Sequence, residues 1–332
     1  MIASPLALDV LSSLESYGEH GGLSLKNLSK IVGANSEKTQ HALLELKHLD
    51  IPLVMSPSGH YSLPQHFSLL NKGEISSGLT NIQAAKMIKL VLLDTVDSTN
   101  RYARDQMKGG NASGLVVLAE QQTAGVGRRG NRWLSPFAAN IYMSIVWSFR
   151  ESSEVLQGLS LAVGVAVCRS LTTMGLSEVK LKWPNDIYLG SRKLGGILLE
   201  MVGGSGVGCS VVIGVGINHD MPTSAGQAID QAWTDIAKET ITPVSRNRFI
   251  ACLIDNIFGI LETFHRVGFS AYQNEWIAAD LMHNLPATIS SPRESVSGTV
   301  IGVDESGALR MVLEDGAEKR FIGGELSLRK QV

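Results

Sequence analysis

Three arginines lie in and beside a glycine-rich segment of the sequence, Gly125-Val126-Gly127-Arg128-Arg129-Gly130. Glycines let backbone N–H groups approach a phosphate closely, and guanidinium groups pair with phosphate or carboxylate oxygens in a fork. Arg128, Arg129 and Arg132 therefore favour contact with an anion over a purely solvated basic loop. The G-x-G-x-x-G spacing also occurs in dinucleotide-binding turns, but these need a helix directly after the glycines. The residues that follow do not resemble a helix start, so the nicotinamide-nucleotide interpretation is disfavoured.

A second group of charged side chains surrounds the turn Pro184-Asn185-Asp186. Lys180 and Lys182 alternate with apolar residues on an expected strand, so both lysines share one face of it. Lys193 follows a few residues later, beside Gly195-Gly196. A hairpin through the turn would bring Lys182 and Lys193 into one region, which favours a shared site over isolated solvated lysines.

Two more segments have both a structural and a functional interpretation. Gly214-Val215-Gly216-Ile217-Asn218-His219 predicts a buried strand that runs into a glycine turn. Asp97-Ser98-Thr99-Asn100 is expected to cap a helix that begins near Arg101, and helix N-termini also bind anions. The sequence contains no GxxxxGK[ST], GxSxG or HExxH motif, so any ATP chemistry here is not of the P-loop kind.

The composition is that of a globular protein of two or three domains, with 332 residues, 44% of them hydrophobic and 18% charged. Its three cysteines show no CxxC spacing, which favours a reducing compartment over a disulfide framework or a zinc site. Lys+Arg (29) and Asp+Glu (31) nearly balance, so a polyanionic partner would need a local basic patch. We find no secretion signal and no apolar stretch long enough to span a bilayer, and expect a cytoplasmic protein without a membrane partner.

Residues 1–66 show the helix, short helix, helix and hairpin order of a winged helix-turn-helix. Ser24 is expected to cap a helix over Leu25–Val32, and Ser36 to cap the next helix, where leucines recur at helical spacing. Pro57-Ser58-Gly59 is expected to turn between the two strands of a wing. A small interaction domain that does not touch DNA is the alternative that this pattern leaves open.

Two further domains are expected, at residues 67–280 and 281–332. Residues 67–87 are polar and predict a linker helix. Apolar runs between glycine-rich turns then predict an α+β fold, with helices segregated from a mixed or antiparallel sheet. Short strands split by turns predict a small β-barrel at the end. The expected strands of the middle domain are Leu115–Ala119, Ile141–Trp147, Val179–Trp183, Gly196–Met201 and Val211–Val215, and its expected helices are Leu159–Thr173 and Arg248–Phe264.

Taken together, these segments resemble the biotin–protein ligase family, specifically the bacterial form that doubles as the biotin operon repressor. The resemblance covers the whole chain, and the segments occur in the order of the family. It implies an N-terminal winged helix-turn-helix, a central mixed-sheet α+β ligase domain and a C-terminal SH3-like β-barrel. The matching segments are Asp97–Asn100, Gly125–Gly130, Trp133–Asn140, Lys182–Asp186, Arg192–Glu200, Gly214–Asn218 and Gly323–Arg329.

The resemblance also implies roles for individual residues. Arg128, Lys193, Lys182 and Asp186 would be catalytic, and Asp186 would reach Mg²⁺ indirectly. The biotin pocket would be formed by Ser98, Thr99, Asn100, Gln122, Val126, Gly127, Arg128 and Lys193. ATP or the adenylate would contact Arg128, Arg129, Arg132, Asn185, Asn218 and Trp233. Operator DNA would contact Lys38, Gln40, His41 and Lys47 of the expected recognition helix.

The reaction implied by the family consumes biotin and ATP in the presence of Mg²⁺. Biotinyl-5′-AMP forms first, and a specific lysine of the biotin carboxyl carrier protein of acetyl-CoA carboxylase then takes the biotin. The adenylate-bound protein would form a homodimer that represses at operator DNA. The family loop usually has the sequence Gly-Arg-Gly-Arg-Arg-Gly, and Val126 replaces its first arginine here, so one cation is missing from the loop.

Three alternatives remain open. They are a lipoate or other acyl-adenylate ligase, a monofunctional biotin ligase whose N-terminal domain binds no DNA, and a transcription factor that uses biotin only as a signal. The Gly-Arg-Arg-Gly loop favours biotin over lipoate, and the presence of Arg128 and Lys193 argues against a pure transcription factor. Residues 1–66 hold four lysines and no arginine against six acids, which counts against DNA binding because phosphate contacts dominate DNA affinity.

Overall fold

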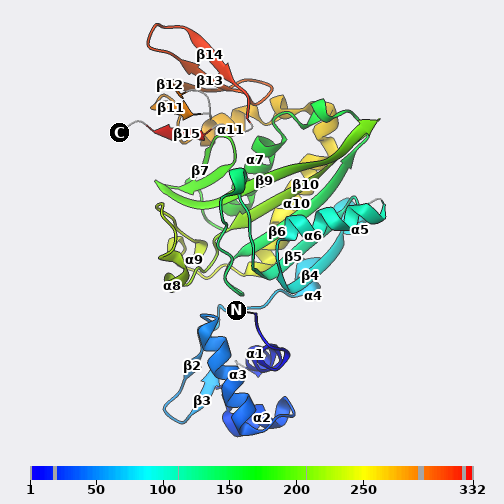
Figure 1. The fold of residues 1–332 in the computed structure, drawn as a ribbon, viewed down its shortest axis with the longest axis vertical. Helices are drawn as coiled ribbons and strands as arrows, with labels where there is room; N and C mark the ends of the chain where they lie inside the picture. Colours follow the sequence, from blue (N-terminus) through cyan, green and yellow to red (C-terminus); the bar gives the residue numbers. More distant parts are fainter. Residues whose placement is uncertain are drawn as a thin grey trace.

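The structure is a computed structural model that describes residues 2–17, 21–110, 112–206, 208–290, 295–323 and 327–330. Three sheets of three, seven and five strands follow one another along the chain. Figure 1 shows them stacked from the N-terminal sheet at the bottom to the C-terminal sheet at the top. The expected mixed α+β architecture is confirmed. Across the described ranges, no helix has the length and apolarity needed to cross a membrane.

The N-terminal part packs helices α1 (Pro5–Tyr17), α2 (Leu25–Ile31) and α3 (Ser36–His48) around a core of mostly aliphatic side chains. The predicted Ser24 cap is confirmed, because its hydroxyl accepts from the amide of Asn27 at 3.2 Å. The predicted Ser36 cap is wrong, because Asn35 is the N-cap and accepts from the amide of Lys38 at 2.9 Å. Strands β1 (Leu23–Ser24), β3 (His60–Ser62) and β2 (Val54–Met55) form an antiparallel sheet in that order.

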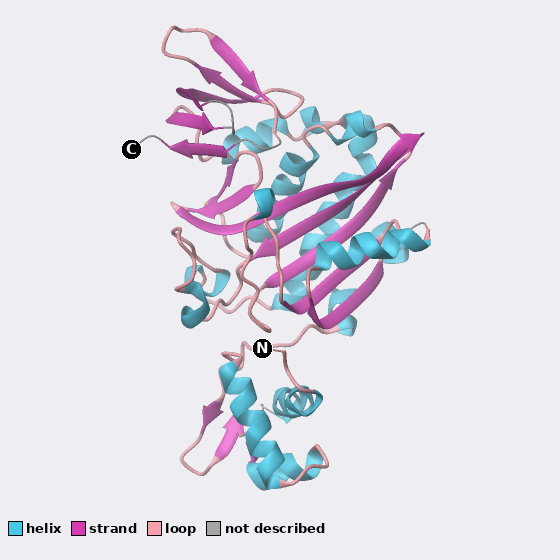
Figure 2. Ribbon diagram, in the orientation of Figure 1, coloured by secondary structure: helices cyan, strands magenta, loops and turns pink. Residues whose placement is uncertain are grey.

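The seven-stranded sheet has the order β4-β5-β6-β10-β9-β8-β7. Only the β4–β5 pair is parallel among the described strands, so the sheet is mixed. Figure 2 shows helix α6 on one face and the longer helices on the other. The strands are β4 (Lys89–Val96), β5 (Leu115–Gln122), β6 (Ile141–Phe149), β7 (Val179–Lys182), β8 (Asp186–Leu189), β9 (Arg192–Gly206) and β10 (Gly208–Ile217). The helices around it are α6 (Thr99–Gln106), α7 (Leu159–Thr173), α8 (Thr223–Gly226), α9 (Ile236–Glu239), α10 (Arg246–Val267) and α11 (Gln273–Ala279).

The two faces of this sheet follow from the alternation of side chains along its strands. In β5, Val116 and Leu118 join the large core beneath α7 and α10, whereas Leu115 and Val117 join the smaller cluster beneath α6. All four side chains are buried. A continuous apolar run is therefore needed here, because both faces of the strand are covered.

The expected single linker helix over residues 67–87 is wrong. Two short helices occupy this part of the chain, α4 (Lys72–Gly78) and α5 (Ile82–Met87). The backbone leaves helical geometry after Gly78, and Asp255 of α10 accepts from the amide of Thr80 at 2.6 Å. The contact with α10 therefore stabilises the interruption between α4 and α5, which the polar composition of residues 67–87 did not indicate.

The last sheet is antiparallel, in the order β14-β13-β12-β11-β15. Residues Asp304–Gly307 form one of its turns, in which the Asp304 carboxylate accepts from the amides of Ser306 at 2.8 Å and Ala308 at 3.0 Å. Residues 324–326 of the segment Gly323–Arg329 lie outside the described residues. The strands are β11 (Pro286–Ser290), β12 (Ser295–Val303), β13 (Leu309–Val312), β14 (Glu318–Phe321) and β15 (Ser327–Lys330).

A buried ion pair lies where the N-terminal part meets the central sheet. The Nη2 of Arg246 and the Oε2 of Glu120 are 2.7 Å apart, and the two residues are 2% and 4% exposed. The same Nη2 donates to the carbonyl of Ser68 at 2.7 Å. Removal of one partner would leave an uncompensated charge inside the protein, which is far more costly than loss of an exposed ion pair.

We predict that Glu120→Ala lowers the free energy of unfolding by about 3–5 kcal/mol. The double variant Glu120→Leu/Arg246→Met should recover most of this loss, because it removes both charges and fills the space. Urea denaturation followed by circular dichroism measures the two values. Equal loss in the single and the double variant would contradict the assignment of the cost to an unpaired Arg246.

Candidate functional site

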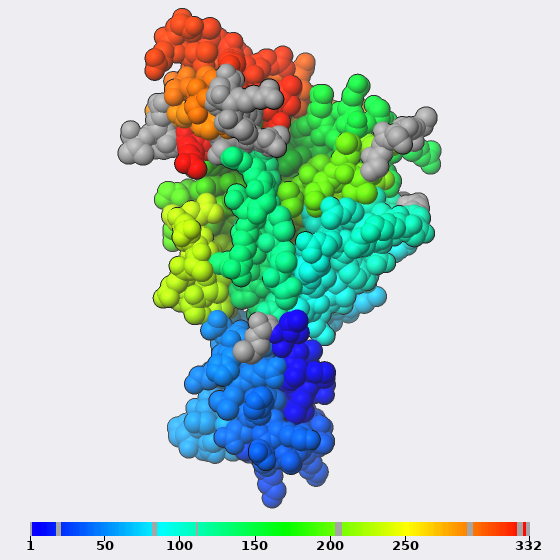
Figure 3. All heavy atoms as spheres, in the orientation of Figure 1, coloured from blue at the N-terminus to red at the C-terminus, as the bar shows by residue number. Residues whose placement is uncertain are grey.

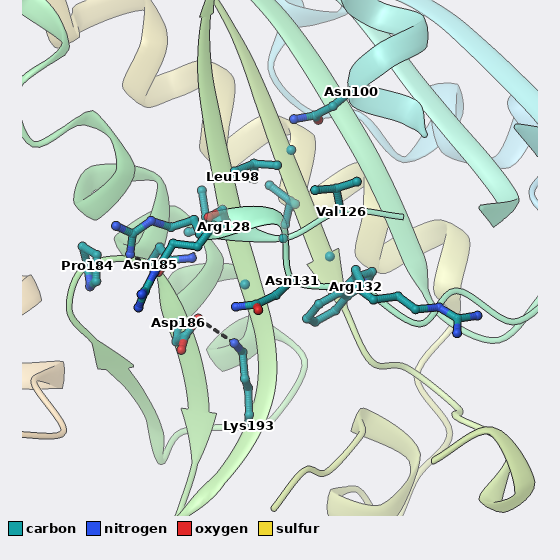
Figure 4. Close-up of a pocket in the computed structure, with 18 of the residues that line it drawn as sticks. Asn100, Val126, Arg128, Asn131, Arg132, Pro184, Asn185, Asp186, Lys193 and Leu198 are labelled. Carbon is teal, nitrogen blue, oxygen red and sulfur yellow. Dashed lines mark hydrogen bonds and ion pairs between the residues drawn. The ribbon is translucent and has the colours of Figure 1, made fainter. Parts of the chain in front are cut away.

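A cavity of about 360 Å³ opens beside the strand ends of the central sheet, beneath the glycine-arginine segment (Figure 4). Its lining comes from the start of α6, from strands β5 to β10 and from β15 of the C-terminal sheet. Most of the residues expected from the sequence to bind a small ligand line it. They are Ser98, Thr99, Asn100, Gln122, Val126, Gly127, Arg128, Arg129, Arg132, Lys182, Asn185, Asp186 and Lys193.

The glycine-arginine segment forms a short hairpin over this cavity. Gly127 donates its amide to the carbonyl of Asn131 at 2.7 Å, and Trp133 donates its amide to the carbonyl of Gly125 at 2.9 Å. A Cβ on Gly125 would lie 2.6 Å from the carbonyl oxygen of Trp133, so the close approach of the two segments requires glycine. Extended chain and turns, without a helix, follow the hairpin up to Asn140. The context that a dinucleotide-binding turn requires is therefore missing.

The predicted hairpin around Asn185 is confirmed. Strands β7 and β8 pair antiparallel, with Lys182 opposite Asp186, and β9 follows with Lys193. Lys182 and Lys193 line the same cavity, as their spacing predicted. The Nδ2 of Asn185 donates to the carbonyl of Ile197 at 2.9 Å, which fixes the turn onto β9.

Cationic groups gather at this end of the cavity. The Nζ of Lys193 lies 2.7 Å from the Oδ1 of Asp186, and Arg128 donates from Nη1 to the Oδ1 of Asn185 at 3.0 Å. Burial lowers the pKa of the Arg128 guanidinium, and burial likewise lowers the pKa of Lys182, with Lys193 adding repulsion. An anionic ligand would offset this loss of hydration, because it supplies the opposite charge at close range.

The other end of the cavity is polar and uncharged. Ser98 caps α6, and the side-chain oxygen of Gln122 accepts from the amide of Thr99 at 2.9 Å and from its hydroxyl at 3.2 Å. The hydroxyl of Ser144 lies 2.6 Å from the Oδ1 of Asn100. These buried groups already have partners, so they hold one another in fixed positions from which they can recognise a neutral polar ligand group.

Bare glycines of β10 form the floor between the two ends. Gly214 and Gly216 line the cavity on the same face of the strand. A Cβ on Gly214 would collide with the Asn100 amide, and one on Gly216 would lie 2.7 Å from the Trp133 ring. The glycines therefore make room for side chains that come from α6 and from the glycine-arginine hairpin.

Two expected nucleotide contacts do not line the cavity in this structure. Asn218 is 3% exposed, and its Nδ2 donates to the carbonyl of Thr234 at 2.9 Å. Trp233 donates from its indole N–H to the carbonyl of Gly226 at 3.1 Å, and the Nζ of Lys238 lies 3.8 Å from its ring centroid. The backbone of Trp233 pairs with that of Lys193, so this segment contacts the strand that carries Lys193.

Several lining residues carried no predicted role, and they come from parts of the chain far apart in sequence. Leu328 and Arg329 belong to the C-terminal sheet, and no local spacing connects them with the hairpin. Trp133 lies in a segment quoted for the resemblance, without a role of its own. The lining residues without a predicted role also include Asn131, Tyr142, Met143, Trp183, Pro184, Tyr188, Gly196, Ile197, Leu198, Val215 and Gln231.

The four expected DNA contacts lie elsewhere. Lys38, Gln40, His41 and Lys47 are all exposed on helix α3. Apolar members of the same helix, such as Leu43 and Leu46, face the N-terminal core. The four side chains therefore share the solvent side of one helix, although none contributes to the cavity.

Comparison with known proteins places this chain among enzymes. The Biotin/lipoate A/B protein ligase family matches residues 92–218, and the Biotin protein ligase C terminal domain matches residues 288–329. The Bifunctional ligase/repressor BirA of Escherichia coli (strain K12) is 35% identical over 320 residues, 96% of this chain and 96% of that protein. The Biotin--[acetyl-CoA-carboxylase] ligase of Paracoccus denitrificans is 31% identical over 224 residues, 66% of this chain and 92% of that protein.

The fold of this chain is also similar to that of a solved structure. The Biotin protein ligase from Aquifex aeolicus in complex with biotin and ATP superimposes with a TM-score of 0.62 at 26% sequence identity. The match covers 73% of this chain and 99% of that one.

We predict that Gly216→Ala loosens the glycine-arginine hairpin, because the new methyl group would displace the Trp133 ring. Overpacking typically costs about 1–3 kcal/mol, so cleavage by trypsin after Arg128, Arg129 and Arg132 should accelerate by about tenfold or more. Gly259→Ala is the matched control, since nothing lies within 4 Å of a Cβ at that exposed site on α10. Equal cleavage rates in both variants would contradict the role of the glycine.

Proposed function

This chain belongs to the biotin protein ligase family, and on that premise we propose that it activates biotin with ATP and transfers it to a carrier protein. The first product is biotinyl-5′-AMP, and the acceptor is a specific lysine of the biotin carboxyl carrier protein of acetyl-CoA carboxylase. The observation that supports this most strongly is one cavity with a neutral polar end and a cationic end, covered by a glycine-arginine hairpin. The polar rings of biotin match the neutral end of the cavity. The carboxylate of biotin and the phosphates of ATP match the cationic end.

The first step joins two anions. An oxygen of the biotin carboxylate attacks the α-phosphorus of ATP, the bond to the β-phosphate oxygen breaks, and pyrophosphate leaves with the electron pair. Lys193 and Arg128 lie where negative charge would otherwise repel the attacking carboxylate, and Lys182 adds a third cation. Preorganised charges of this kind stabilise the transition state without reorganisation of solvent.

The second step transfers the acyl group. The unprotonated amine of the carrier lysine attacks the acyl carbon, AMP leaves, and the extra amine proton passes to solvent. Water would hydrolyse the mixed anhydride before this step, so a hairpin that covers the cavity protects it. No residue of this chain forms a covalent intermediate in the proposed sequence.

Individual assignments follow the two ends of the cavity. Biotin contacts Ser98, Thr99, Asn100, Gln122, Val126, Gly127, Arg128 and Lys193 in this proposal. The nucleotide contacts Arg128, Arg129, Arg132, Asn185, Asn218 and Trp233. For Trp233 the proposal requires movement, because its indole must leave the Gly226 carbonyl to reach the nucleotide.

Magnesium enters the proposal as part of the substrate, Mg–ATP. Asp186 is the one carboxylate among the described residues that line the cavity, which is too few ligands for a resident ion. Mg²⁺ is commonly held by one or two carboxylates together with substrate phosphates, and Asp186 fits that arrangement. The ion would neutralise phosphate charge, while Lys193 would exchange its bond with Asp186 for a phosphate oxygen.

We predict that Lys193→Ala lowers the rate of biotinyl-5′-AMP formation by about 10²–10³-fold, because it removes one charge from the reacting phosphate. Lys180→Ala is the matched control: this lysine lies on the same hairpin, but its Nζ donates to the carbonyl of Ala278 at 3.2 Å. The readout is single-turnover formation of labelled adenylate. A near-normal rate in the Lys193 variant would remove Lys193 from the reaction.

The domain assignment belongs to the same proposal. We divide the chain into a winged helix-turn-helix at 1–66, a catalytic domain at 67–280 and an SH3-like barrel at 281–332. The antiparallel β1-β3-β2 sheet beside three helices supports the first, and the five-stranded antiparallel sheet supports the last.

We further propose that the N-terminal domain binds operator DNA as a homodimer of the adenylate-bound protein, and so represses biotin genes. Helix α3 presents Lys38, Gln40, His41 and Lys47 to solvent, in the manner of a recognition helix. The two-fold symmetry of a dimer matches a palindromic site. The name Bifunctional ligase/repressor, given to relatives matched over 96% of this chain, supports the same combination.

We predict an adenylate-dependent, salt-sensitive complex between the protein and the DNA upstream of its own biotin genes. Lys38→Ala should weaken it at every sequence and reduce the slope of log affinity against log salt by about 1, because one phosphate contact is lost. Lys86→Ala, on helix α5, is the control. If gel shifts detect no such complex, the monofunctional ligase is the correct alternative.

A further inference from the structure

The hydrophobic core of the N-terminal domain contains a residue of the catalytic domain. Phe137 is 2% exposed and packs in the cluster that is otherwise built from residues 3–63 and its neighbour Ala138. Figure 3 shows the N-terminal domain at one end of the molecule, where it meets the catalytic domain, and Phe137 belongs to the contact between them. An aromatic ring buried across such a junction fixes the backbone on either side of it.

Hydrogen bonds also hold the chain segment between the two domains. Arg246 and Asn247, at the start of α10, bind the carbonyls of Ser68 at 2.7 Å and Leu69 at 3.0 Å. Carboxylates of the two domains bind the linker amides: Glu15 of α1 accepts from Leu69, and Glu120 of β5 accepts from Leu70. The bond from Leu69 to Glu15 crosses between the two domains, and the others fix residues 68–70 on the catalytic domain.

Phe137 lies shortly after the hairpin that covers the cavity, separated from Trp133 by Leu134, Ser135 and Pro136. Ser135, two residues before it, accepts on its hydroxyl from the Nε2 of Gln122 at 3.0 Å. The Oε1 of Gln122 accepts from the amide of Thr99 at 2.9 Å. A short path of one backbone segment and two hydrogen bonds thus joins the N-terminal core to a residue that lines the cavity.

The neighbours of Phe137 hold the same segment. Tyr142 donates its hydroxyl to the carbonyl of Pro136 at 2.8 Å, and Ala138 donates its amide to the carbonyl of Glu120 at 3.0 Å. These two bonds keep the segment near the sheet. The amide of Gln122 also donates to the carbonyl of Ser135 at 3.4 Å, and the hydroxyl of Ser135 donates to the carbonyl of Trp133 at 3.1 Å. The ring of Phe137 adds the contact that ties this segment to the core of the other domain.

We propose that Phe137 is a positioning residue of the biotin site: its ring, held in the N-terminal core, fixes Ser135 and through it the Gln122 amide that meets Thr99. This inference rests on the proposed ligase function. The N-terminal domain is then part of the frame of the catalytic site as well as a DNA-binding module. If the hairpin is in its binding position for only a fraction of the time, the apparent dissociation constant for biotin rises by the inverse of that fraction.

The test compares Phe137→Ala, Phe137→Leu and Leu28→Ala in the full-length protein. Leu28 is fully buried in the same cluster, but it lies on α2 at the end of the N-terminal domain remote from the junction (Figure 1). Biotin-dependent ATP–pyrophosphate exchange gives KM and kcat, and hydrogen exchange measures the amides of Gly127 and Trp133, which are bonded within the hairpin.

Phe137→Ala should raise the KM for biotin by about tenfold, with kcat changed by less than about threefold, because biotin binding completes the site once the hairpin orders. The two hairpin amides should exchange about tenfold faster. Phe137→Leu should restore most of both values, and Leu28→Ala should leave both unchanged.

Wild-type KM and amide exchange in Phe137→Ala would overturn the inference. So would equal effects in Leu28→Ala, since general loss of N-terminal stability would then explain them. If the wild-type protein shows no biotin-dependent exchange, the proposed function fails, and the hydrogen-exchange comparison alone decides whether Phe137 holds the hairpin.

Discussion

The cavity must bring a carboxylate and a phosphate into contact, and these groups repel one another. Arg128, Lys182 and Lys193 line this cavity together, and we propose that they meet the constraint. Burial lowers the pKa of the Arg128 and Lys182 side chains. The β7–β8 hairpin and the pairing of β8 with β9 bring Lys182 and Lys193 to one cavity, where Asp186 lies 2.7 Å from the Nζ of Lys193.

Residues away from these cationic side chains shape the same cavity. The glycines of β10 leave room for Asn100 and Trp133 over the floor of the cavity, and Gly125 lets the covering hairpin close on itself. The C-terminal sheet contributes Leu328 and Arg329 to the rim. The N-terminal domain holds the stem of the hairpin through the buried ring of Phe137, according to our proposal. In this proposal, three domains contribute to one site, and the central domain supplies its cationic side chains.

Local patterns were informative where a short segment determines its own structure. Helix α7 has the bounds that its apolar run predicted, Leu159–Thr173, and the hairpin around Asn185 brought Lys182 and Lys193 to one cavity. Long-range contacts account for what the sequence did not indicate. Arg329 reaches the cavity from the end of the chain, and the break between α4 and α5 depends on Asp255 of α10. The position of Trp233 depends on its bond to Gly226, a contact that no residue pattern specifies.

The central claim is that this cavity joins the carboxylate of biotin to ATP. ATP–pyrophosphate exchange by the wild-type protein tests it most directly, with biotin, biotinol or lipoate as the only added acyl candidate. The account predicts exchange that requires biotin and Mg–ATP, and no exchange with biotinol, which has the same rings but lacks the carboxylate. Exchange supported by lipoate and not by biotin, or no exchange with any of the three, would contradict it.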